Sequence, residues 1–466
     1  MGTNGQSGLG EALGGERVAL SEVVGALSYA LDITEGQPEG HAVRACMIGM
    51  RLGEEIGLSE SRRSALFYAL LLKDLGCSSN AAKICYLFGA DDQRVKHGFK
   101  FTDWQSVLKS LPYIIKSVAP SGSPLERLRR FLSVAVSGTK GAKELIKIRC
   151  ERGALIARDL DLPEEAVQAI RNLDEHWNGR GHPDGLRGEE IPLLARILSV
   201  SQTAEVFLTR YGLAAALQIV RARRTSWFDP DLVRAFESIA EDTPFWMDVM
   251  SGQERRHVAR FEPRGMALHA DEATIDRLCG AFSQVVDAKS PWTACHSQGV
   301  SDVAVGIGRV MGLGARELTG LRRAGLLHDI GKLGVSNAVL DKPGRLTEAE
   351  FARLREHPAH THRILSRAAC FEPIAELAAR HHEKLDGSGY HRGLRGAELS
   401  LPERVLVVAD MYEALAAKRP YRQDLSEGEV MDILGREAGV RIDAGCVEAL
   451  GVFLERTGFE PYRVAA

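Results

Sequence analysis

The stretch AGLLHDIG at residues 324–331 indicates how the chain is organised, because a second version of it, ALLLKDLG, occurs at residues 69–76. Each is an apolar run, typical of a buried helix, that ends in a basic residue followed by an aspartate. The two versions are separated by an offset of 255 residues, which also carries His41 onto His296. A repeat of this kind indicates that one domain occurs twice in the chain.

A second repeated block lies at a shorter offset. Gly185–Gly188 and Gly393–Gly396 both read GLRG and are 208 residues apart. The difference between the two offsets, 47 residues, predicts an insertion in the first copy. The polar stretch Ser251–Glu262 is typical of a connection between domains. We therefore expect a flexible N-terminus at 1–16, a first copy at 17–245 with an insertion at about 78–140, a linker at 246–275 and a second copy at 276–466.

Composition and periodicity indicate the fold class. The chain has 466 residues, of which 45% are hydrophobic and 26% charged, as in an ordinary globular protein. Segments such as Val43–Ile56 and Ser301–Met311 carry apolar residues at three- and four-residue spacing. This spacing predicts helices that each bury one face, and hence an all-α protein of two tandem helical bundles.

Charge and cysteine usage exclude several functional classes. A net charge of −3 provides no electrostatic footprint for nucleic acid. Eight scattered cysteines without a C-x-x-C pair indicate reduced thiols rather than a secreted disulfide framework. No window approaches 18 consecutive apolar residues, so we expect no membrane span. These patterns predict a cytoplasmic protein that binds neither nucleic acid nor a membrane.

The histidines indicate the chemistry. Of fourteen histidines, eight lie in the second copy, and the pairs His328-Asp329 and His381-His382 end apolar runs, as does Asp410. Imidazoles and carboxylates at the ends of buried helices must be paired or must bind metal. Two divalent ions about 3.5–4 Å apart form the usual clamp on a phosphodiester. Nitrogen and oxygen ligands without thiolate favour iron, manganese or zinc over magnesium alone, and we expect iron or manganese.

Eight motifs of the second copy match one known family. In family order they are His296-Ser, His328-Asp-Ile-Gly-Lys332, Lys342-Pro-Gly-x-Leu346, Glu356-His357-Pro, His381-His-Glu-x-x-Asp-Gly-x-Gly-Tyr390, Gly393-Leu-Arg-Gly396, Ala409-Asp410 and Arg419-Pro-Tyr-Arg422. The second copy thus resembles an HD-GYP domain, the cyclic di-GMP phosphodiesterase branch of the HD phosphohydrolases. The resemblance implies metal-dependent hydrolysis of a bacterial second messenger.

The resemblance also implies a role for each site residue. One metal would be held by His296, His328, Asp329 and Asp410, and the other by His357, His381 and His382, with Asp329 bridging. A hydroxide shared by the metals would be the nucleophile. Asp329 and Lys332 would be catalytic, Lys332 by neutralising charge on phosphoryl oxygens. Substrate contacts would come from Lys332, Asp386, Gly387, Gly389, Tyr390, Arg419 and Arg422.

Two positions depart from the family pattern. The Gly-Tyr-Pro triplet reads Gly389-Tyr390-His391, which keeps the tyrosine. Members with three metals carry a glutamate at the position of Trp292, so two metals are expected here. The expected product is pGpG, and further cleavage to GMP is left open.

The first copy has lost most of the ligand set. Five of the seven ligand positions differ in residue type, and Lys73 takes the place of His328. We expect a degenerate HD-GYP-like domain that packs on the active copy or regulates it. Its insertion, which includes Lys96–Lys100 and extends to the stretch Ser137–Lys143, is predicted to be a lid or partner surface. A protein partner bound there and a homodimer are both open alternatives.

These patterns favour a cyclic di-GMP phosphodiesterase. A second hypothesis keeps the metal site but changes the substrate to another cyclic dinucleotide or nucleotide. A third, from a different class, is a sensor or adaptor that binds the nucleotide without turnover. The complete ligand set favours catalysis, because a protein that only binds the nucleotide would not need to keep seven metal ligands.

Overall fold

The structure is a computed structural model that describes residues 18–462 except 104–105, 121, 254–257, 259, 267, 294 and 418–424. The side chains of 107–108, 137–140 and 142 are also outside the description, as is the expected flexible segment 1–16. The described chain consists of helices joined by turns and loops, with one two-stranded antiparallel sheet. The predicted all-α class is confirmed.

The described elements follow one another in two series. The first half comprises β1 (Val18–Ala19), α1 (Leu20–Thr34), α2 (His41–Glu55), α3 (Glu60–Leu72), the 3-10 helix η1 (Cys77–Asn80), α4 (Ala81–Phe88), α5 (Asp92–Phe99), α6 (Val107–Ser117), α7 (Pro124–Asp159), α8 (Glu164–Arg171), η2 (Gly188–Glu190), α9 (Leu193–Tyr211), α10 (Leu213–Ala222), α11 (Pro230–Ile239) and α12 (Thr243–Val249). The second half comprises η3 (Arg264–Met266), β2 (His269–Ala270), α14 (Glu272–Asp287), α15 (His296–Val310), α16 (Ala315–Leu327), η4 (Ile330–Gly334), α17 (Asn337–Leu340), α18 (Glu348–Leu354), α19 (His357–Leu365), η5 (Ala369–Phe371), α20 (Glu372–Ala379), η6 (Gly396–Glu398), α21 (Leu401–Ala416), α22 (Glu427–Glu437) and α23 (Ala444–Thr457).

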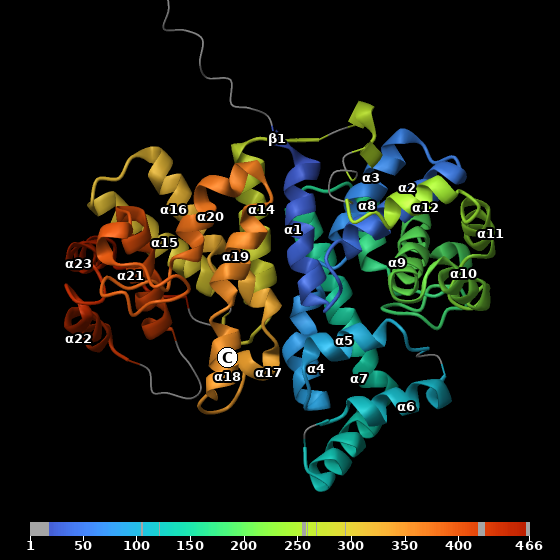
Figure 1. The fold of residues 1–466 in the computed structure, drawn as a ribbon, viewed down its shortest axis with the longest axis horizontal. Coiled ribbons are helices and arrows are strands. Elements are labelled where there is room, and N and C mark those ends of the chain that lie inside the picture. The colour runs from blue at the N-terminus through green and yellow to red at the C-terminus, as the bar shows by residue number, and fades with distance from the viewer. Residues whose placement is uncertain are drawn as a thin grey trace, which may run out of the picture.

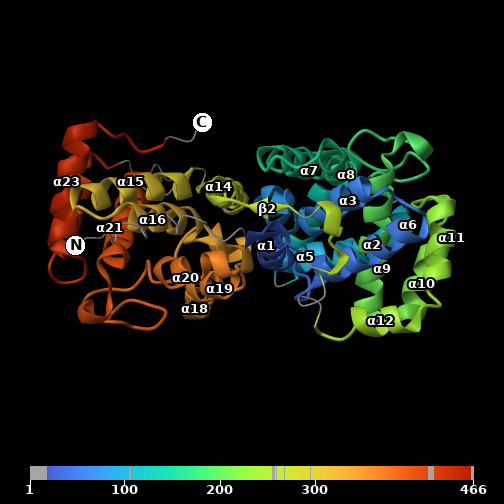
Figure 2. The ribbon, with the colours of Figure 1, turned by 90° about the horizontal axis from the view of Figure 1, so that it is seen from above.

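The two halves are helical bundles that lie side by side, with α1 and α14 at the junction (Figures 1 and 2). One continuous set of buried apolar side chains runs through both halves. Strands β1 and β2 pair across the junction, and α1 packs against η4 and α19 of the second half. The guanidinium of Arg367 lies 3.5 Å from the ring centroid of Tyr29 at this junction. The halves therefore share one core.

Equivalent side chains make equivalent contacts in the two halves. α2 and α15 both begin with a histidine, and the Nδ1 atoms of His41 and His296 contact Glu205 and Glu413 respectively. These glutamates come from α9 and α21, the long helices that follow the GLRG blocks. The internal repeat seen in the sequence is thus also a repeat of buried polar contacts.

One glycine in each half is required by close packing. A Cβ atom on Gly76 would lie 1.9 Å from the carbonyl oxygen of Arg149, and one on Gly331 would lie 1.9 Å from that of His357. Only glycine therefore lets the 3-10 turn after each Lys-Asp or His-Asp pair pack against α7 or α19. This packing holds the His328-Asp329 pair close to α19.

The residues predicted as an insertion form α4, α5, α6 and the first part of α7, which project from the first half in Figure 1. They have a small core of their own, which includes Ile84, Phe88 and Val95. Within the insertion, Lys96 and Lys100 are buried against Glu35, so these two side chains do not form an exposed surface. A lid or partner surface elsewhere on the insertion stays a prediction.

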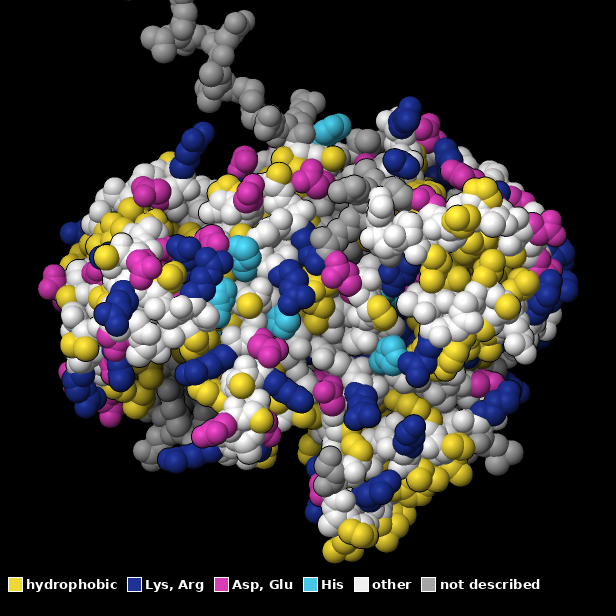
Figure 3. Space-filling model, in the orientation of Figure 1, with side chains coloured by type: hydrophobic (Ala, Val, Ile, Leu, Met, Phe, Trp, Pro, Cys, Tyr) yellow, Lys and Arg dark blue, Asp and Glu magenta, His cyan; other side chains and the backbone are white. Residues whose placement is uncertain are grey.

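An apolar stripe on α7 is exposed. Leu125, Leu128, Leu132 and Val136 are 52–88% exposed at helical spacing, and hydrophobic side chains cover the projecting tip in Figure 3. A protein partner bound through the first half therefore stays a prediction.

The segment expected as a linker begins inside a helix. Trp246 and Val249 of α12 are buried in the core, and α14 starts at Glu272. Between them, η3 packs against α3. Within the described residues, no helix combines the length and apolar character needed to cross a bilayer.

Candidate metal centre and adjoining pocket

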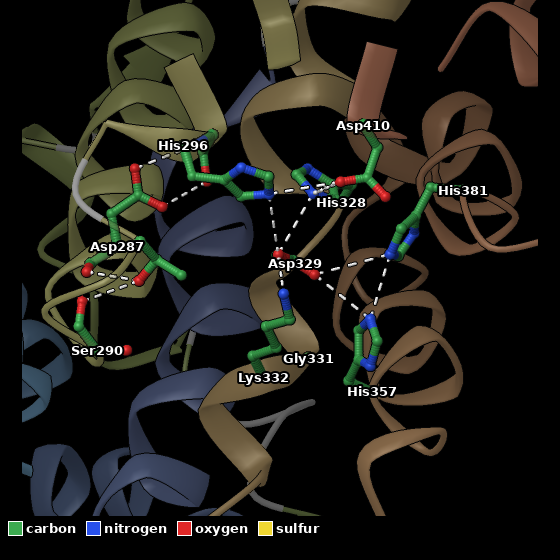
Figure 4. A network of polar contacts seen from close by, with 12 residues as sticks. Asp287, Ser290, His296, His328, Asp329, Gly331, Lys332, His357, His381 and Asp410 are labelled. Carbon is green, nitrogen blue, oxygen red and sulfur yellow. Dashed lines mark hydrogen bonds and ion pairs between the residues drawn. The ribbon is translucent and has the colours of Figure 1, made fainter. Parts of the chain in front are cut away.

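Seven polar side chains of the second half converge on one point, and Figure 4 labels all of them except His382. Helix ends provide most of them, since α15 and α19 begin with a cluster histidine and α16 and α20 lead into one. The seven are His296 of α15, His328 and Asp329 after α16, His357 of α19, His381 and His382 after α20, and Asp410 of α21. The structure therefore brings together every residue predicted as a metal ligand.

Asp329 lies between two groups of histidines. Its Oδ2 is 3.6 Å from Nε2 of His296 and 3.3 Å from Nε2 of His328. Its Oδ1 is 3.4 Å from Nε2 of His357 and 3.7 Å from Nε2 of His381. One carboxylate thus faces both groups, one oxygen to each, which is the geometry of a bridging ligand.

Asp410 adds a second carboxylate. Its Oδ1 lies 3.5 Å from Nε2 of His296 and 3.7 Å from Nε2 of His328, and its Oδ2 lies 3.6 Å from Nδ1 of His382. Donor atoms of His296, His328 and Asp410, and separately of His357, His381 and His382, all lie within 4.8 Å of one another. Each set has the size of a metal coordination sphere.

The tautomers of three histidines are fixed by the backbone. His328, His357 and His381 each donate from Nδ1 to the carbonyl oxygen three residues earlier, at 2.6–2.7 Å. In a ring that is protonated on Nδ1 alone, Nε2 keeps its lone pair, and here the Nε2 atoms face the carboxylates of the cluster. These rings are therefore oriented as acceptors.

The donor set fits divalent metal ions. Nε2 of His357 and Nε2 of His381 are only 3.2 Å apart, so two lone pairs face each other where a cation would relieve their repulsion. Nε2 of His328 and Oδ1 of Asp329 are buried and have no hydrogen-bond partner. A buried acceptor without a partner is costly unless a cation binds it. Imidazole nitrogens and carboxylate oxygens suit first-row divalent ions.

The cluster is strongly polarised. Against the effect of burial, Lys332 and His328 hold the pKa of Asp329 well below its usual value, and His296 does the same for Asp410. Burial and the neighbouring imidazoles hold the pKa of His381 well below its usual value, and burial lowers the pKa of His382 to about 3. The carboxylates are therefore anionic and these two imidazoles neutral, the protonation states in which they bind metal.

Two carboxylates that support the cluster were missed by sequence reasoning. Glu413 contacts Nδ1 of His296 and, against burial, raises the pKa of that ring. Asp287 accepts from the backbone N–H and the hydroxyl of Ser297, at 3.3 and 2.7 Å, and so holds the start of α15. The repeat contained the signal for Glu413, because Glu205 lies 208 residues before it.

Lys332 faces the cluster from η4. Its Nζ contacts Oδ2 of Asp329, and the side chain remains 22% exposed. The turn that carries it is held by Thr361, whose hydroxyl accepts from the N–H of Gly331 at 3.0 Å and donates to the carbonyl of His328 at 2.8 Å. Lys332 is thus a cation between the cluster and solvent.

A pocket of about 710 Å³ adjoins the cluster at His382. The ring of Tyr390 lies 4.7 Å from that of His382, and the guanidinium of Arg355 lies 5.0 Å from the Tyr390 ring. Lys384 donates to Sδ of Met411 at 2.8 Å, and burial lowers its pKa. The pocket is lined by Arg355, His382, Lys384, Ser388, Gly389, Tyr390, Met411, Ala414, Leu415, Ile433, Glu437 and Arg441. Its size is that of a small-molecule site.

The predicted substrate residues are in different places. Gly389 and Tyr390 line the pocket, whereas Asp386 and Gly387 form the preceding turn, in which Oδ1 of Asp386 accepts from the N–H of Ser388 at 2.8 Å. Gly387 has a φ of +80°, which favours glycine. The predicted contacts Arg419 and Arg422 lie outside the described residues.

The corresponding positions of the first half contain ion pairs. Lys73 contacts Asp74, and both side chains are buried. Arg149, at the position of His357, contacts Asp174, at the position of His382. Donor atoms of Glu35, Asp74 and Cys77 lie within 4.8 Å of one another, but lysines already pair with both carboxylates. The first-half cluster is therefore neutralised by its own side chains.

The chain is similar to a family of HD domains, to bacterial cyclic-dinucleotide phosphodiesterases and to a solved structure. The family model described as "HD domain" matches residues 139–232 and 280–445. The 3'3'-cGAMP-specific phosphodiesterase 3 of Vibrio cholerae is 43% identical over 431 residues, which are 92% of this chain and 94% of that protein. The cyclic di-GMP phosphodiesterase response regulator of Xanthomonas campestris is 34% identical over 39% of this chain and 47% of its own length. A crystal structure of a cyclic GMP-AMP specific phosphodiesterase of Vibrio cholerae superposes with a TM-score of 0.64 at 38% identity, over 94% of this chain and 98% of that one.

Proposed function

The chain belongs to the HD-GYP branch of the HD-domain phosphodiesterases, which are metal-dependent, and we propose that its substrate is the cyclic dinucleotide 3'3'-cGAMP. The relative specific for 3'3'-cGAMP matches both halves of the chain, whereas the cyclic di-GMP relative from Xanthomonas campestris matches only part of it. The observation that carries the proposal is the fully assembled His/Asp cluster beside a nucleotide-sized pocket.

We propose the ligand assignment that the distances favour. His296, His328 and Asp410 would hold one divalent ion and His357, His381 and His382 the other, with Asp329 shared. Such a pair of ions, when bound, supplies an activated water and neutralises the phosphodiester. Iron or manganese is the proposed metal; zinc also suits imidazole nitrogens and carboxylate oxygens, whereas magnesium alone is disfavoured.

Side chains around the cluster would then bind and orient the substrate. Lys332 lies at the cluster and is exposed enough to reach a substrate, so it would neutralise a phosphoryl oxygen as charge builds up in the transition state. Tyr390, with Arg355 beside its ring, offers a flat surface for a base. Lys384 and Arg441 of the same pocket are suited to the second phosphate.

The proposed product is the linear dinucleotide. Trp292 occupies the position at which family members with three metals carry a glutamate. Its side chain has no metal-binding atom and is partly exposed. Cyclic di-GMP is the second candidate substrate, because the relative that matches 39% of this chain, from Xanthomonas campestris, acts on it by name.

We also propose that the halves 17–245 and 276–466 are two copies of one domain and that only the second is catalytic. Support comes from the equivalent His–Glu pairs and from the two glycines that each pack against a carbonyl. In the first half, Lys73 and Arg149 stand where His328 and His357 stand in the second. Neither cation can coordinate a metal ion.

The test compares 3'3'-cGAMP, cyclic di-GMP and cyclic di-AMP as substrates of the manganese- or iron-loaded full chain, with products separated by chromatography. We expect 3'3'-cGAMP to give the highest kcat/KM and a linear dinucleotide. His328→Ala/Asp329→Ala should abolish turnover, whereas His362→Ala, a control on the same helix as His357, should retain it. Higher kcat/KM for cyclic di-GMP would overturn the substrate assignment, and tight binding without turnover would indicate a sensor.

A further inference from the structure

Asp92, the first residue of α5, reaches from the inserted part of the first half into the second half. Its side chain is 0% exposed. Its Oδ1 accepts from the backbone N–H of Asn337 at 2.8 Å and from the hydroxyl of Ser336 at 3.2 Å. Its Oδ2 lies 3.6 Å from Nζ of Lys289, whose side chain is 1% exposed. This is a buried ion pair between the halves.

The segments that Asp92 joins both lead into the metal cluster. Ser336 and Asn337 follow η4, the turn that carries Lys332 directly after Asp329. Lys289 belongs to the segment between α14 and His296. The side-chain amide of Asn337 donates to the carbonyl of Lys289 at 2.7 Å, which fastens the two segments to each other.

The next residue of α5, Gln93, binds a backbone carbonyl of η4 through its side chain. The side-chain amide of Gln93 donates to the carbonyl oxygen of Leu333, within η4, at 2.9 Å. It also donates to the carbonyl of Ile33, at the end of α1, at 3.1 Å. η4 is thus held by Thr361 of its own half and by α5 of the other half.

The opposite end of α5 is anchored in the degenerate cluster of the first half. Lys96 donates to the carbonyl of Cys77 at 2.5 Å and lies 3.5 Å from Glu35. Lys100 lies 3.3 Å from Glu35 and 3.9 Å from Asp74, the equivalent of Asp329. The lysines that neutralise the first-half cluster therefore also fix the helix that contacts the second half.

We propose that α5 is a strut between the degenerate cluster and the active one, and that Asp92 and Gln93 are positioning residues for the phosphodiesterase. They act through η4 on Asp329 and Lys332, and through Lys289 on the approach to His296. This inference rests on the proposed function, because it assumes that the second-half cluster holds metal and cleaves the substrate. It gives the catalytically inactive half a role in the chemistry.

The expected effect is on turnover and metal affinity rather than on nucleotide binding. The pocket is lined by residues 355, 382–390, 411–415 and 433–441, whereas α5 contacts residues 289 and 333–337 of the second half. A small displacement of Asp329 and Lys332 can cost about a hundredfold in rate. Asp92→Asn and Gln93→Ala should therefore lower kcat about tenfold or more and weaken Mn²⁺ binding, with KM within about twofold of the parent.

The test measures kcat, KM and Mn²⁺ affinity by calorimetry on the metal-free full chain. Glu39→Gln is the matched control, because Glu39 forms a 3.0 Å ion pair with Arg367 that also links the halves, but through the segment after α19 rather than through η4. Asp92→Glu keeps the charge and should restore part of kcat. If Asp92→Asn does not fold, Gln93→Ala decides, since it removes only an amide.

The proposal is overturned if both α5 variants keep kcat and Mn²⁺ affinity within twofold of the Glu39→Gln control, or if KM rises while kcat stays unchanged. Mn²⁺ affinity is read without substrate, so it tests the strut even if the parent chain cleaves no cyclic dinucleotide. Lack of turnover by the parent would count against the proposed function alone.

Discussion

Glu413→Gln tests whether the buried glutamate on His296 serves the metal site or only the fold. The carboxylate contacts Nδ1 of His296, and both side chains are buried, at 2% and 6% exposure. The amide oxygen of glutamine can still accept from that nitrogen, so the variant removes the charge and keeps the shape. The first half contains the same pair, His41 and Glu205, without the set of predicted ligands around it.

The magnitude follows from the position of the charge. A carboxylate on the distal nitrogen makes a ligating imidazole more basic, and loss of such a partner lowers metal affinity about 10- to 100-fold, or about 1.4–2.8 kcal/mol. Glu205 also accepts from Nε of Arg44 at 2.8 Å and from the hydroxyl of Thr209 at 2.9 Å. Glu205→Gln would weaken the pairing of Arg44, so it should cost about 1–3 kcal/mol of unfolding free energy with no change in metal affinity.

The assay is a calorimetric Mn²⁺ titration of both variants and the parent, combined with denaturant unfolding of the metal-free proteins. Glu413→Gln should shift the dissociation constant, and Glu205→Gln should shift only the unfolding midpoint. If Glu413→Gln binds Mn²⁺ as tightly as the parent, the reasoning is refuted, because the pair would then serve packing alone. Equal losses of affinity in the two variants would refute it too.

Three further outcomes follow from the site. Gly331→Ala should cost about 3 kcal/mol of unfolding free energy, because the added Cβ would lie 1.9 Å from the carbonyl oxygen of His357. Denaturant unfolding checks this against Gly320→Ala, whose added Cβ would lie 3.8 Å from its nearest neighbour, a methyl carbon of Ile374. Equal unfolding midpoints for the two variants would contradict the prediction. Lys332→Met should lower kcat about 100-fold while the bound metal, measured by elemental analysis, is unchanged; loss of metal would instead make Lys332 structural. Mn²⁺ at 100 times its dissociation constant should stabilise the chelator-treated chain by about 2.7 kcal/mol in thermal unfolding, and an equal shift in Asp329→Asn would indicate a different binding site.

Much of the site could be predicted because its residues lie in short motifs at helix ends. His328-Asp329 and His381-His382 are adjacent in sequence, so the helices before them deliver both members of each pair to one place. The matching family model and the relative at 43% identity confirm the predicted HD-GYP membership. The helical periodicity was sufficient for the fold class, because each helix buries one face in the shared core.

The unpredicted part depends on contacts between distant segments. Asp92 binds the backbone of Asn337, 245 residues away, and no periodicity or motif marks a lone aspartate at the start of an inserted helix. The burial of Lys96 and Lys100 could not be predicted for the same reason, since only packing reveals that both side chains pair with Glu35. The pocket wall at Glu437 and Arg441 likewise depends on where α22 and the segment after it pack.

Comparison of the two halves separates the residues that the fold needs from those that the chemistry needs. Gly76 and Gly331 are both glycine because a carbonyl oxygen occupies the space of a side chain, with or without a metal nearby. The positions of His328 and His357, by contrast, hold cations in the first half. His41 belongs to both classes: it keeps its contact with Glu205 where the metal ligands are lost. A histidine at the start of this helix is therefore part of the scaffold in both halves, and in the second half its ring also faces the His/Asp cluster.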